Sequence, residues 1–307
     1  KGMAPKADII TVKAGNASFP FSNVIDGMNY CGEVAANEGK PVVVNMSLGG
    51  DFGPHDGTSA QDQAVDNFVS SSSGRAVVIA AGNAGNSGMH TSSTISPSSS
   101  ASFDIDVPSS VSSGEFRADT WISNSNDATI KIETPGGTTV GPLTPLDSDG
   151  ELVQSTSEGR VRLQNYTPAS LGGGDRRLFI EVDDDNGNAP AQGTWTVTVT
   201  NTSSSSFTHH AWLYDDFISG NVSADLIGGN GNYTIGTPGS SKDAITVGAF
   251  NHRWRWCSDS GGCYLASGSV DNSDDIASFS SIGSFRDGTR KPEITAPGQK
   301  MGSSYSD

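Results

Sequence analysis

The sequence predicts an α/β fold in which a doubly wound parallel sheet is interrupted by an all-β sandwich or jelly roll. Two observations predict the α/β part: unbroken apolar runs at residues 42–44 and 76–81, and a segment of helical periodicity before each run. Continuous β-branched runs of this kind are typical of parallel strands that are covered on both faces. A third observation predicts the insertion, because residues 103–199 alternate apolar and polar side chains with period two.

The composition restricts the class of protein. The chain has 307 residues, which suggests about two domains, and its formal net charge is -16. An acidic surface argues against nucleic acid and anionic membranes as partners. No apolar run reaches the length of a transmembrane helix, and no signal peptide is recognisable. Because the first residue is Lys1 rather than Met, we expect a processed chain or a piece of one.

The first predicted unit, residues 1–88, begins with a strand and a helix. Residues 8–14 form a β-branched run that predicts a strand. Apolar residues then recur at helical spacing from about Ser22 to Glu38, and Gly39 supplies the usual helix end.

A second strand and helix follow in the same unit. Residues 42–50 are interpreted as a buried strand with the loop at its carboxyl end. Thr58 and Gln61 form a capping-box pattern before a helix whose apolar residues lie on one face. This helix leads into residues 76–81, so the order is β-α-β-α-β, which predicts a doubly wound parallel sheet.

The predicted insertion spans residues 89–230. It begins with a serine-rich linker at residues 91–102. Its alternating strands are expected at residues 103–107, 130–132, 178–182 and 195–199. Turn residues between these strands, and the lack of a convincing helix, favour an antiparallel sandwich or jelly roll. Residues 243–250 resume the buried-strand pattern, so residues 231–307 are predicted to complete the α/β domain.

The strand at residues 76–81 ends at two small residues, Gly82 and Asn83. Small residues at the carboxyl end of a parallel strand leave space where ligands of open α/β sheets bind. The Asn83 amide could donate a hydrogen bond there, as the oxyanion hole of an acyl-transfer site requires. Two alternatives stay open at this stage. Asn83 could be a turn residue, and Gly82, Gly85 and Gly88 could suggest a dinucleotide loop, although their spacing is not G-x-G-x-x-G.

Several short motifs decide between these interpretations. They are GMAPKA at 2–7, VNMSLGG at 44–50, AAGN at 80–83, TPG at 237–239, AITVGA at 244–249, ASFSS at 277–281 and KPEITAPG at 291–298. In this order, the motifs resemble the middle of a subtilisin-like serine protease, and the resemblance covers residues 1–88 and about 231–307. The insertion after Asn83 resembles the jelly roll that some bacterial subtilases carry.

The resemblance implies roles for the residues around the strand ends. Asn83 matches the side-chain donor of the family's oxyanion hole. Ser47, Leu48 and Gly49 match the segment whose backbone pairs with an extended substrate, a form of strand addition.

The resemblance also implies a primary specificity pocket. Ala80, Ala81 and Gly82 match one wall of this pocket, and Gly236 matches a position in its base. A glycine there leaves volume, so we expect a preference for large apolar side chains before the scissile bond. By the same resemblance, the bond from Thr237 to Pro238 is expected to be cis.

The catalytic triad of the family is not found in this sequence. Its motifs would be D-[ST]-G, H-G-T-H and G-T-S-M-A; the chain begins just after the expected histidine and stops just before the expected serine. Gly57-Thr58-Ser59 mimics the serine motif, but it precedes the oxyanion strand and is explained by capping of the next helix. The histidines are predicted to be surface or packing residues: His55, His90, His209, His210 and His252.

The leading hypothesis is a secreted endopeptidase of the subtilisin type that acts on protein or peptide substrates. This chain alone is expected to be inactive, and the missing protease segments could form a separate chain. The rival hypothesis is a non-catalytic subtilase relative that acts as a binding or scaffold protein through its β-sandwich.

Metal and cysteine sites complete the predictions. No cofactor is predicted. Residues 183–188 are rich in carboxylates but do not have the spacing of an EF-hand loop, so an acidic turn is favoured. Calcium stays an alternative, since subtilases often bind it. Cys257 and Cys263 bracket a short Gly-Ser loop, which favours a disulfide over two free thiols. Cys31 lies on an apolar helical stripe and is predicted to be a core residue.

Overall fold

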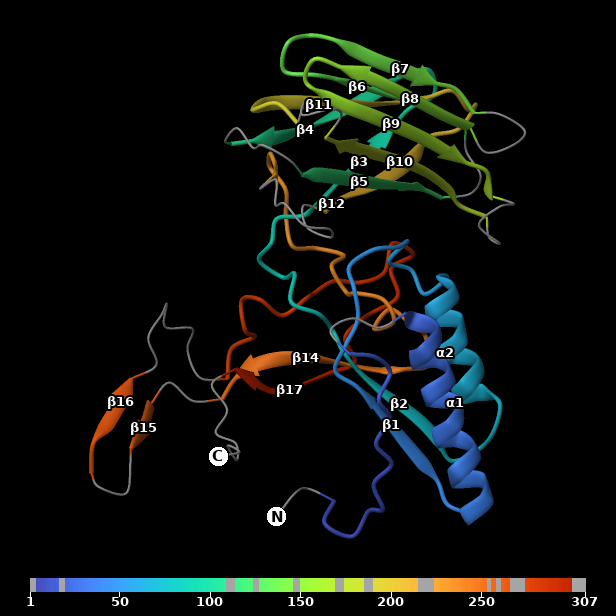
Figure 1. Cartoon of the computed structure of the whole chain (residues 1–307), viewed down its shortest axis with the longest axis vertical. Helices are drawn as coiled ribbons and strands as arrows, with labels where there is room; N and C mark the ends of the chain where they lie inside the picture. Colours follow the sequence, from blue (N-terminus) through green and yellow to red (C-terminus); the bar gives the residue numbers. More distant parts are fainter. Residues whose placement is uncertain are drawn as a thin grey trace.

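The computed structural model describes residues 4–16, 20–108, 114–123, 127–145, 150–168, 174–184, 190–214, 224–252, 255–257, 261–265 and 274–299. Figure 1 shows two stacked parts. The lower part is a parallel sheet with both described helices beside it, and the upper part consists of two antiparallel sheets. None of the helices among these residues is long and apolar enough to cross a membrane.

The parallel sheet has four strands in the order β1-β2-β14-β17. They are β1 (Val42–Met46), β2 (Arg75–Ala80), β14 (Ile245–Asn251) and β17 (Ile294–Gln299). β14 pairs directly with β2 although residues 81–244 separate them in sequence. The chain thus leaves this sheet after β2, forms the antiparallel sheets, and returns to the neighbouring position.

Both described helices pack on one face of this sheet, α1 (Phe21–Glu38) and α2 (Ala60–Ser70). Met28 of α1 and Phe68 of α2 join Val77 and Ile79 of β2 in one buried apolar cluster. α1 ends as predicted, because Gly39 adopts a left-handed conformation with φ 64°. Within the described residues no helix covers the opposite face, so the doubly wound arrangement stays a prediction.

The start of α2 corrects the predicted capping box by one residue. The N-cap is Ser59, whose Oγ accepts a hydrogen bond from Asp62 N and donates one to Asp62 Oδ2. Thr58 and Gln61 do not pair in this way. A serine that caps a helix fits the prediction that Ser59 is structural.

The predicted strand at residues 8–14 is wrong, because none of the strands that the structure describes pairs with this segment. The segment is attached by single contacts instead: Asn23 Nδ2 donates to Ala14 O at 2.8 Å, and Val12 packs against Gly27. Ile9 is 87% exposed. β-branched residues alone do not make a strand where the backbone finds no partner.

Two antiparallel sheets form the upper part. The first has the order β3-β12-β5-β10-β9-β8 and the second the order β13-β4-β11-β6-β7. The first comprises β3 (His90–Ile95), β12 (Phe207–Tyr214), β5 (Glu115–Ile122), β10 (Arg176–Asp183), β9 (Gly159–Tyr166) and β8 (Gly150–Thr156). The second comprises β13 (Asp225–Leu226), β4 (Ser100–Val107), β11 (Gly193–Asn201), β6 (Ala128–Glu133) and β7 (Thr139–Leu143). Inward side chains of both sheets form one buried cluster, with Trp195 and Leu163 fully buried.

The four strands predicted in this part correspond to β4, β6, β10 and β11. The predicted linker at residues 91–102 is wrong, since it contains most of β3 and the start of β4. Its hydroxyl groups pair across strands: Ser93 Oγ lies 2.8 Å from His209 Nε2, and Thr94 Oγ1 lies 2.8 Å from Thr208 Oγ1. Such cross-strand pairs stabilise a sheet whose sequence is polar.

A small hairpin of β15 (Arg255–Cys257) and β16 (Cys263–Leu265) lies apart from both larger units. Cys257 and Cys263 form a disulfide in it. Cys31 is free and buried in α1, as predicted. The Thr237–Pro238 peptide is cis, as predicted.

Candidate functional site

Three segments that are distant in sequence meet at the carboxyl ends of β1 and β2. Gly50 N donates to Thr237 O at 2.9 Å, and Thr237 N donates to Gly50 O at 2.8 Å. Gly236 N donates to Ala81 O at 3.0 Å. The structure therefore brings the predicted substrate segment, the predicted pocket wall and the predicted pocket base together.

The glycines here permit close approach of these backbones. A Cβ placed on Gly49 would lie 2.8 Å from Thr237 O, and one on Gly236 would lie 2.9 Å from Gly50 O. Both distances are shorter than real Cβ contacts. The glycine at 236 is therefore required for packing against Gly50, which the volume argument from the sequence did not foresee.

The predicted substrate segment continues from β1, which is an edge strand of the described sheet. Ser47 and Gly49 are exposed, while Leu48 is partly buried against the apolar cluster under the helices. Ser47 Oγ accepts a hydrogen bond from Asn45 Nδ2 at 3.2 Å. An exposed segment beyond an edge strand leaves backbone groups free to pair with another chain.

Asn83 lies on a bend just after β2. Its side chain is exposed, and in the part of the chain that the structure describes its amide has no hydrogen-bond partner. The preceding residue, Gly82, has φ 111°, a conformation that favours glycine. Asn83 is thus presented to solvent beside Ala81, which is buried, and Ala80, which is exposed.

Ser281 fixes the backbone on both sides of Asn83. Its amide donates to Gly82 O at 3.0 Å, and its Oγ accepts a hydrogen bond from Ala84 N at 3.0 Å. A Cβ on Gly82 would lie 2.7 Å from Ser281 Oγ, so this contact also requires glycine. Ser281 ends the ASFSS motif, but its role could not be predicted from that motif.

Asp51 is a second residue that the sequence analysis missed. Its Oδ1 lies 3.3 Å from the Cβ position of Gly236 and 3.7 Å from that of Gly82. Burial raises the pKa of the Asp51 carboxyl group. The available signal was an acidic residue directly after the S-L-G-G sequence.

A buried aromatic and histidine cluster lies behind this loop. His55 stacks on Trp212 with ring centroids 4.3 Å apart, and its Nδ1 and Nε2 lie 2.9 and 2.7 Å from Ile235 O and Asp51 O. His90 Nε2 lies 3.0 Å from His210 Nδ1.

Burial disfavours the charged form of these histidines. It lowers the pKa of His55, His90 and His209 to about 4 and that of His210 to about 3. Within the described residues, no histidine contacts a carboxylate group, so none is paired as a catalytic base would be. All five histidines were predicted to be surface or packing residues; these four are buried as packing residues are, and His252 is partly exposed.

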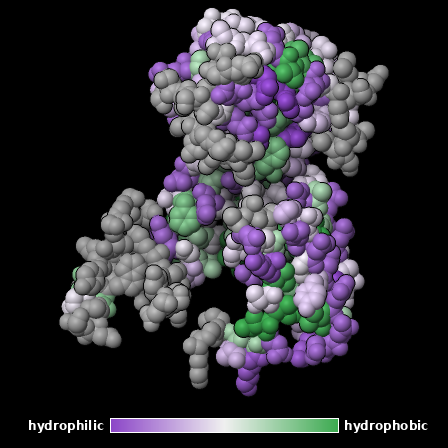
Figure 2. Space-filling model, in the orientation of Figure 1, coloured by the Kyte–Doolittle hydropathy of each residue, from purple (hydrophilic) through white to green (hydrophobic). Residues whose placement is uncertain are grey.

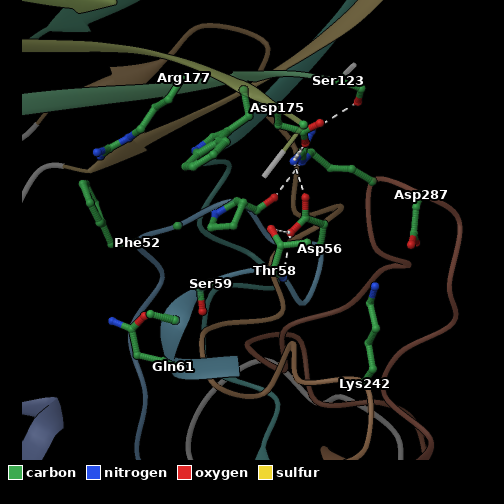
Figure 3. A pocket seen from close by; sticks show the side chains of 16 residues that line it. Phe52, Asp56, Thr58, Ser59, Gln61, Ser123, Asp175, Arg177, Lys242 and Asp287 are labelled. Carbon is green, nitrogen blue, oxygen red and sulfur yellow. Dashed lines mark hydrogen bonds and ion pairs between the residues drawn. The ribbon is translucent and has the colours of Figure 1, made fainter. Parts of the chain in front are cut away.

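A cavity of about 590 Å³ lies at the start of α2 and is lined by residues of both parts of the molecule (Figure 3). Arg286 joins the parts beside it. Its guanidinium donates to Asp56 from the lower part and to Asp175 and Ser123 from the upper part. Each carboxylate in this group is therefore paired, and the arrangement fixes the orientation of one part against the other.

Metal-ligand geometry does not occur in the described part of the chain, where no three His, Cys, Asp or Glu side chains are grouped to hold an ion. The acidic turn at residues 183–188 lies largely outside the described residues.

Comparisons with known proteins agree on one family. The model of the subtilase family matches residues 1–212 and 217–307. A stretch of 72 residues is 42% identical to a subtilisin-like protease of Coccidioides posadasii (strain C735), covering 22% of this chain and 17% of that protein. The structure of the Clostridium perfringens CspB protease has the same fold, with a TM-score of 0.77 and 20% identity. That match covers 98% of this chain and 58% of the CspB chain, so this chain spans less than two thirds of either relative.

Proposed function

This chain belongs to the subtilase family, and from this premise we propose that the whole protein is a serine endopeptidase that hydrolyses peptide bonds in proteins. The observation that carries the proposal is the meeting of three loops at Ala81, two residues before the exposed Asn83, whose backbone is held on both sides by Ser281. An exposed amide on a backbone that is held in place, with no partner among the described residues, is suited to bind an oxygen that becomes negative only in the transition state.

The surrounding residues have roles that follow from their positions. The exposed backbone of Ser47–Gly49 pairs with an extended substrate, because it continues an edge strand. Ala80–Gly82 form one wall of the pocket for the side chain before the scissile bond, and Gly236 forms part of its base. Their mutual contacts through Gly50 and Ala81 support this assignment.

The nucleophile and the general base are not among the residues assigned above. In the whole enzyme a serine attacks the peptide carbonyl, a histidine transfers the proton, and Asn83 donates a hydrogen bond to the oxyanion. None of residues 1–307 lies in a matching triad motif. We therefore propose that this chain alone hydrolyses no peptide bond, and that the triad segments come from adjoining sequence or from a separate chain.

The proposal includes domain organisation and location. Residues 1–88 and 231–307 form the doubly wound α/β domain, and residues 89–230 form an inserted sandwich or jelly roll. The grouping of the strands into parallel and antiparallel sheets supports this division. We place the enzyme outside the cell, since the Cys257–Cys263 disulfide suits an oxidising environment.

The test is turnover of a chromogenic peptide by three proteins: this chain, a version extended to include the triad segments, and the extended version with Asn83→Ala. We expect activity only in the extended proteins, with Asn83→Ala lowering kcat about 10²- to 10³-fold and leaving substrate binding nearly unchanged, the loss known for such a donor in subtilisin. Asn86→Ala, in the same exposed loop, is the matched control and should keep full activity.

Each other outcome has a definite meaning. Full activity of the extended Asn83→Ala variant would remove Asn83 from the site. An extended protein that folds but hydrolyses nothing would contradict the proposal and favour the non-catalytic relative.

A further inference from the structure

The pocket proposed above contains a carboxylate at its base. Asp51 Oδ1 lies 3.3 Å from the Cβ position of Gly236 and 3.7 Å from that of Gly82. These glycines come from different loops, and the carboxylate faces both. A ligand side chain that reaches the base of the proposed pocket would therefore meet Asp51.

Asp51 is partly buried, and its carboxylate differs from the fully buried carboxylates Asp119 and Asp62. Asp119 is paired with Arg177, and Asp62 accepts hydrogen bonds from Ser59 and Ser240. In contrast, none of the described residues forms an ion pair or a side-chain hydrogen bond with the Asp51 carboxylate, and burial raises its pKa. A carboxylate that is partly removed from water without a partner is destabilising, and a bound cation would relieve that cost.

The backbone of Asp51 is held in place. Asp51 O accepts hydrogen bonds from His55 Nε2 at 2.7 Å and from the Tyr214 hydroxyl, which lies at the end of β12 in the upper part. Gly50, the preceding residue, exchanges two hydrogen bonds with Thr237. These bonds orient the carboxylate before a ligand arrives, so little conformational entropy is lost on binding.

We propose that Asp51 determines specificity by binding the ammonium or guanidinium group of a lysine or arginine side chain before the scissile bond. This inference rests on the proposed function and names its substrate class. The aliphatic stem of either side chain packs against Ala80 and Ala81, while its charged end reaches Asp51. A large apolar side chain, expected from the sequence alone, would instead cover the carboxylate and leave it unpaired. The net charge of -16 favours approach of basic substrates in the same sense.

The test measures binding rather than turnover, so it uses this chain as it is. Acetyl-Ala-Ala-X-amide peptides, with X arginine, lysine, norleucine or glutamate, are titrated calorimetrically into the wild-type chain, Asp51→Asn and Asp225→Asn. Asp225 is an exposed carboxylate in β13 and serves as the matched control. Thermal unfolding of each variant checks that it is folded.

The arginine and lysine peptides should bind the wild-type chain about 10- to 100-fold more tightly than the norleucine peptide, as expected for a hydrogen-bonded charge pair. Asp51→Asn should abolish this preference without weakening the norleucine peptide, and Asp225→Asn should retain it. Equal binding of the arginine and norleucine peptides, or a preference for arginine that survives in Asp51→Asn, would overturn the role of Asp51 but not the proposed protease function. If no peptide binds the wild-type chain, the proposed substrate site fails and the inference with it. If Asp51→Asn does not fold, the comparison of the four peptides on the wild-type chain tests the inference, and a lack of preference for arginine and lysine would overturn it.

Discussion

The two parts of the molecule bury their apolar residues to different extents. In the upper part, both antiparallel sheets contribute to one buried cluster, and Trp195 is 0% exposed. In the lower part, the helices cover one face of the parallel sheet, but Val43 is 68% and Ile294 52% exposed. Figure 2 shows hydrophobic residues in green on the surface of the lower part, near β1. The apolar cluster of the upper part is thus enclosed by its own two sheets, whereas the lower part, which carries the candidate site, leaves apolar side chains of its edge strands exposed.

The motifs that resemble subtilases lie in the lower part, whereas the larger buried apolar cluster lies in the upper part. Exposed apolar side chains stabilise a fold little, because they are not removed from water. The loops that form the candidate site are instead held by hydrogen bonds, such as those between Gly50 and Thr237. We therefore expect core substitutions in the upper part to cost far more stability than substitutions on the open face below.

The largest expected effect compares the two parts directly. Trp195→Ala should lower the free energy of unfolding of the upper part by about 3–5 kcal/mol, since it removes a fully buried ring that packs against Phe116. Val43→Ala should change stability by less than about 0.5 kcal/mol. Urea unfolding followed by circular dichroism measures both. A large loss in Val43→Ala would show that the open face is covered in solution.

Acid should weaken the boundary between the two parts. Burial lowers the pKa of His55 from 6.5 to about 4, and it outweighs the opposite effect of the contacts with Ile235 O and Asp51 O. The unfolded chain therefore binds protons more readily, so the stabilising contribution is complete above pH 6.5 and is lost as the pH falls towards 4. Between pH 7 and pH 5 this histidine should account for roughly 2 kcal/mol.

His55→Gln tests this expectation. Although the variant loses the stacking on Trp212, its free energy of unfolding should depend less on pH than that of the wild-type chain. His252→Gln, outside the buried cluster, should keep the wild-type dependence. An unchanged pH dependence in His55→Gln would show that this ring is not held neutral by burial.

The smallest effect concerns the helix beside the cavity. Ser59→Ala removes the N-cap of α2 and should cost about 1 kcal/mol, confined to the lower part. Ser72→Ala, an exposed serine after the same helix, should be neutral. Thermal unfolding compares the two variants, and equal stability would mean that Asp62 or water replaces the cap.

The sequence predicted those elements whose signal is local. The apolar run before Gly82 located β2, and Gly39 located the end of α1. Residues 8–14 have the composition of a strand, but whether a strand forms depends on a partner that the local sequence does not specify. β3 was missed for the converse reason, because its serines and threonines pair with β12, which lies far away in sequence.

The candidate site shows the same limit. The resemblance indicated Asn83 and the three loops, since these residues lie in short motifs. It could not indicate Asp51, whose importance arises only when Gly236 and Gly82 approach it from other loops. Likewise, Ser281 holds the backbone beside Asn83 through a hydrogen bond from Ala84, which lies 197 residues away in sequence. Residues that act through distant contacts require the folded structure.

The most direct test of the account is to locate the bound peptide on the labelled chain by nuclear magnetic resonance. On addition of acetyl-Ala-Ala-Arg-amide, we expect shift changes in the backbone amides of Ser47–Gly49 and in the side-chain amide of Asn83, with residues 90–226 largely unaffected. Changes confined to residues 90–226 would contradict the account, because they would place binding on the antiparallel sheets and support a binding protein instead of a protease.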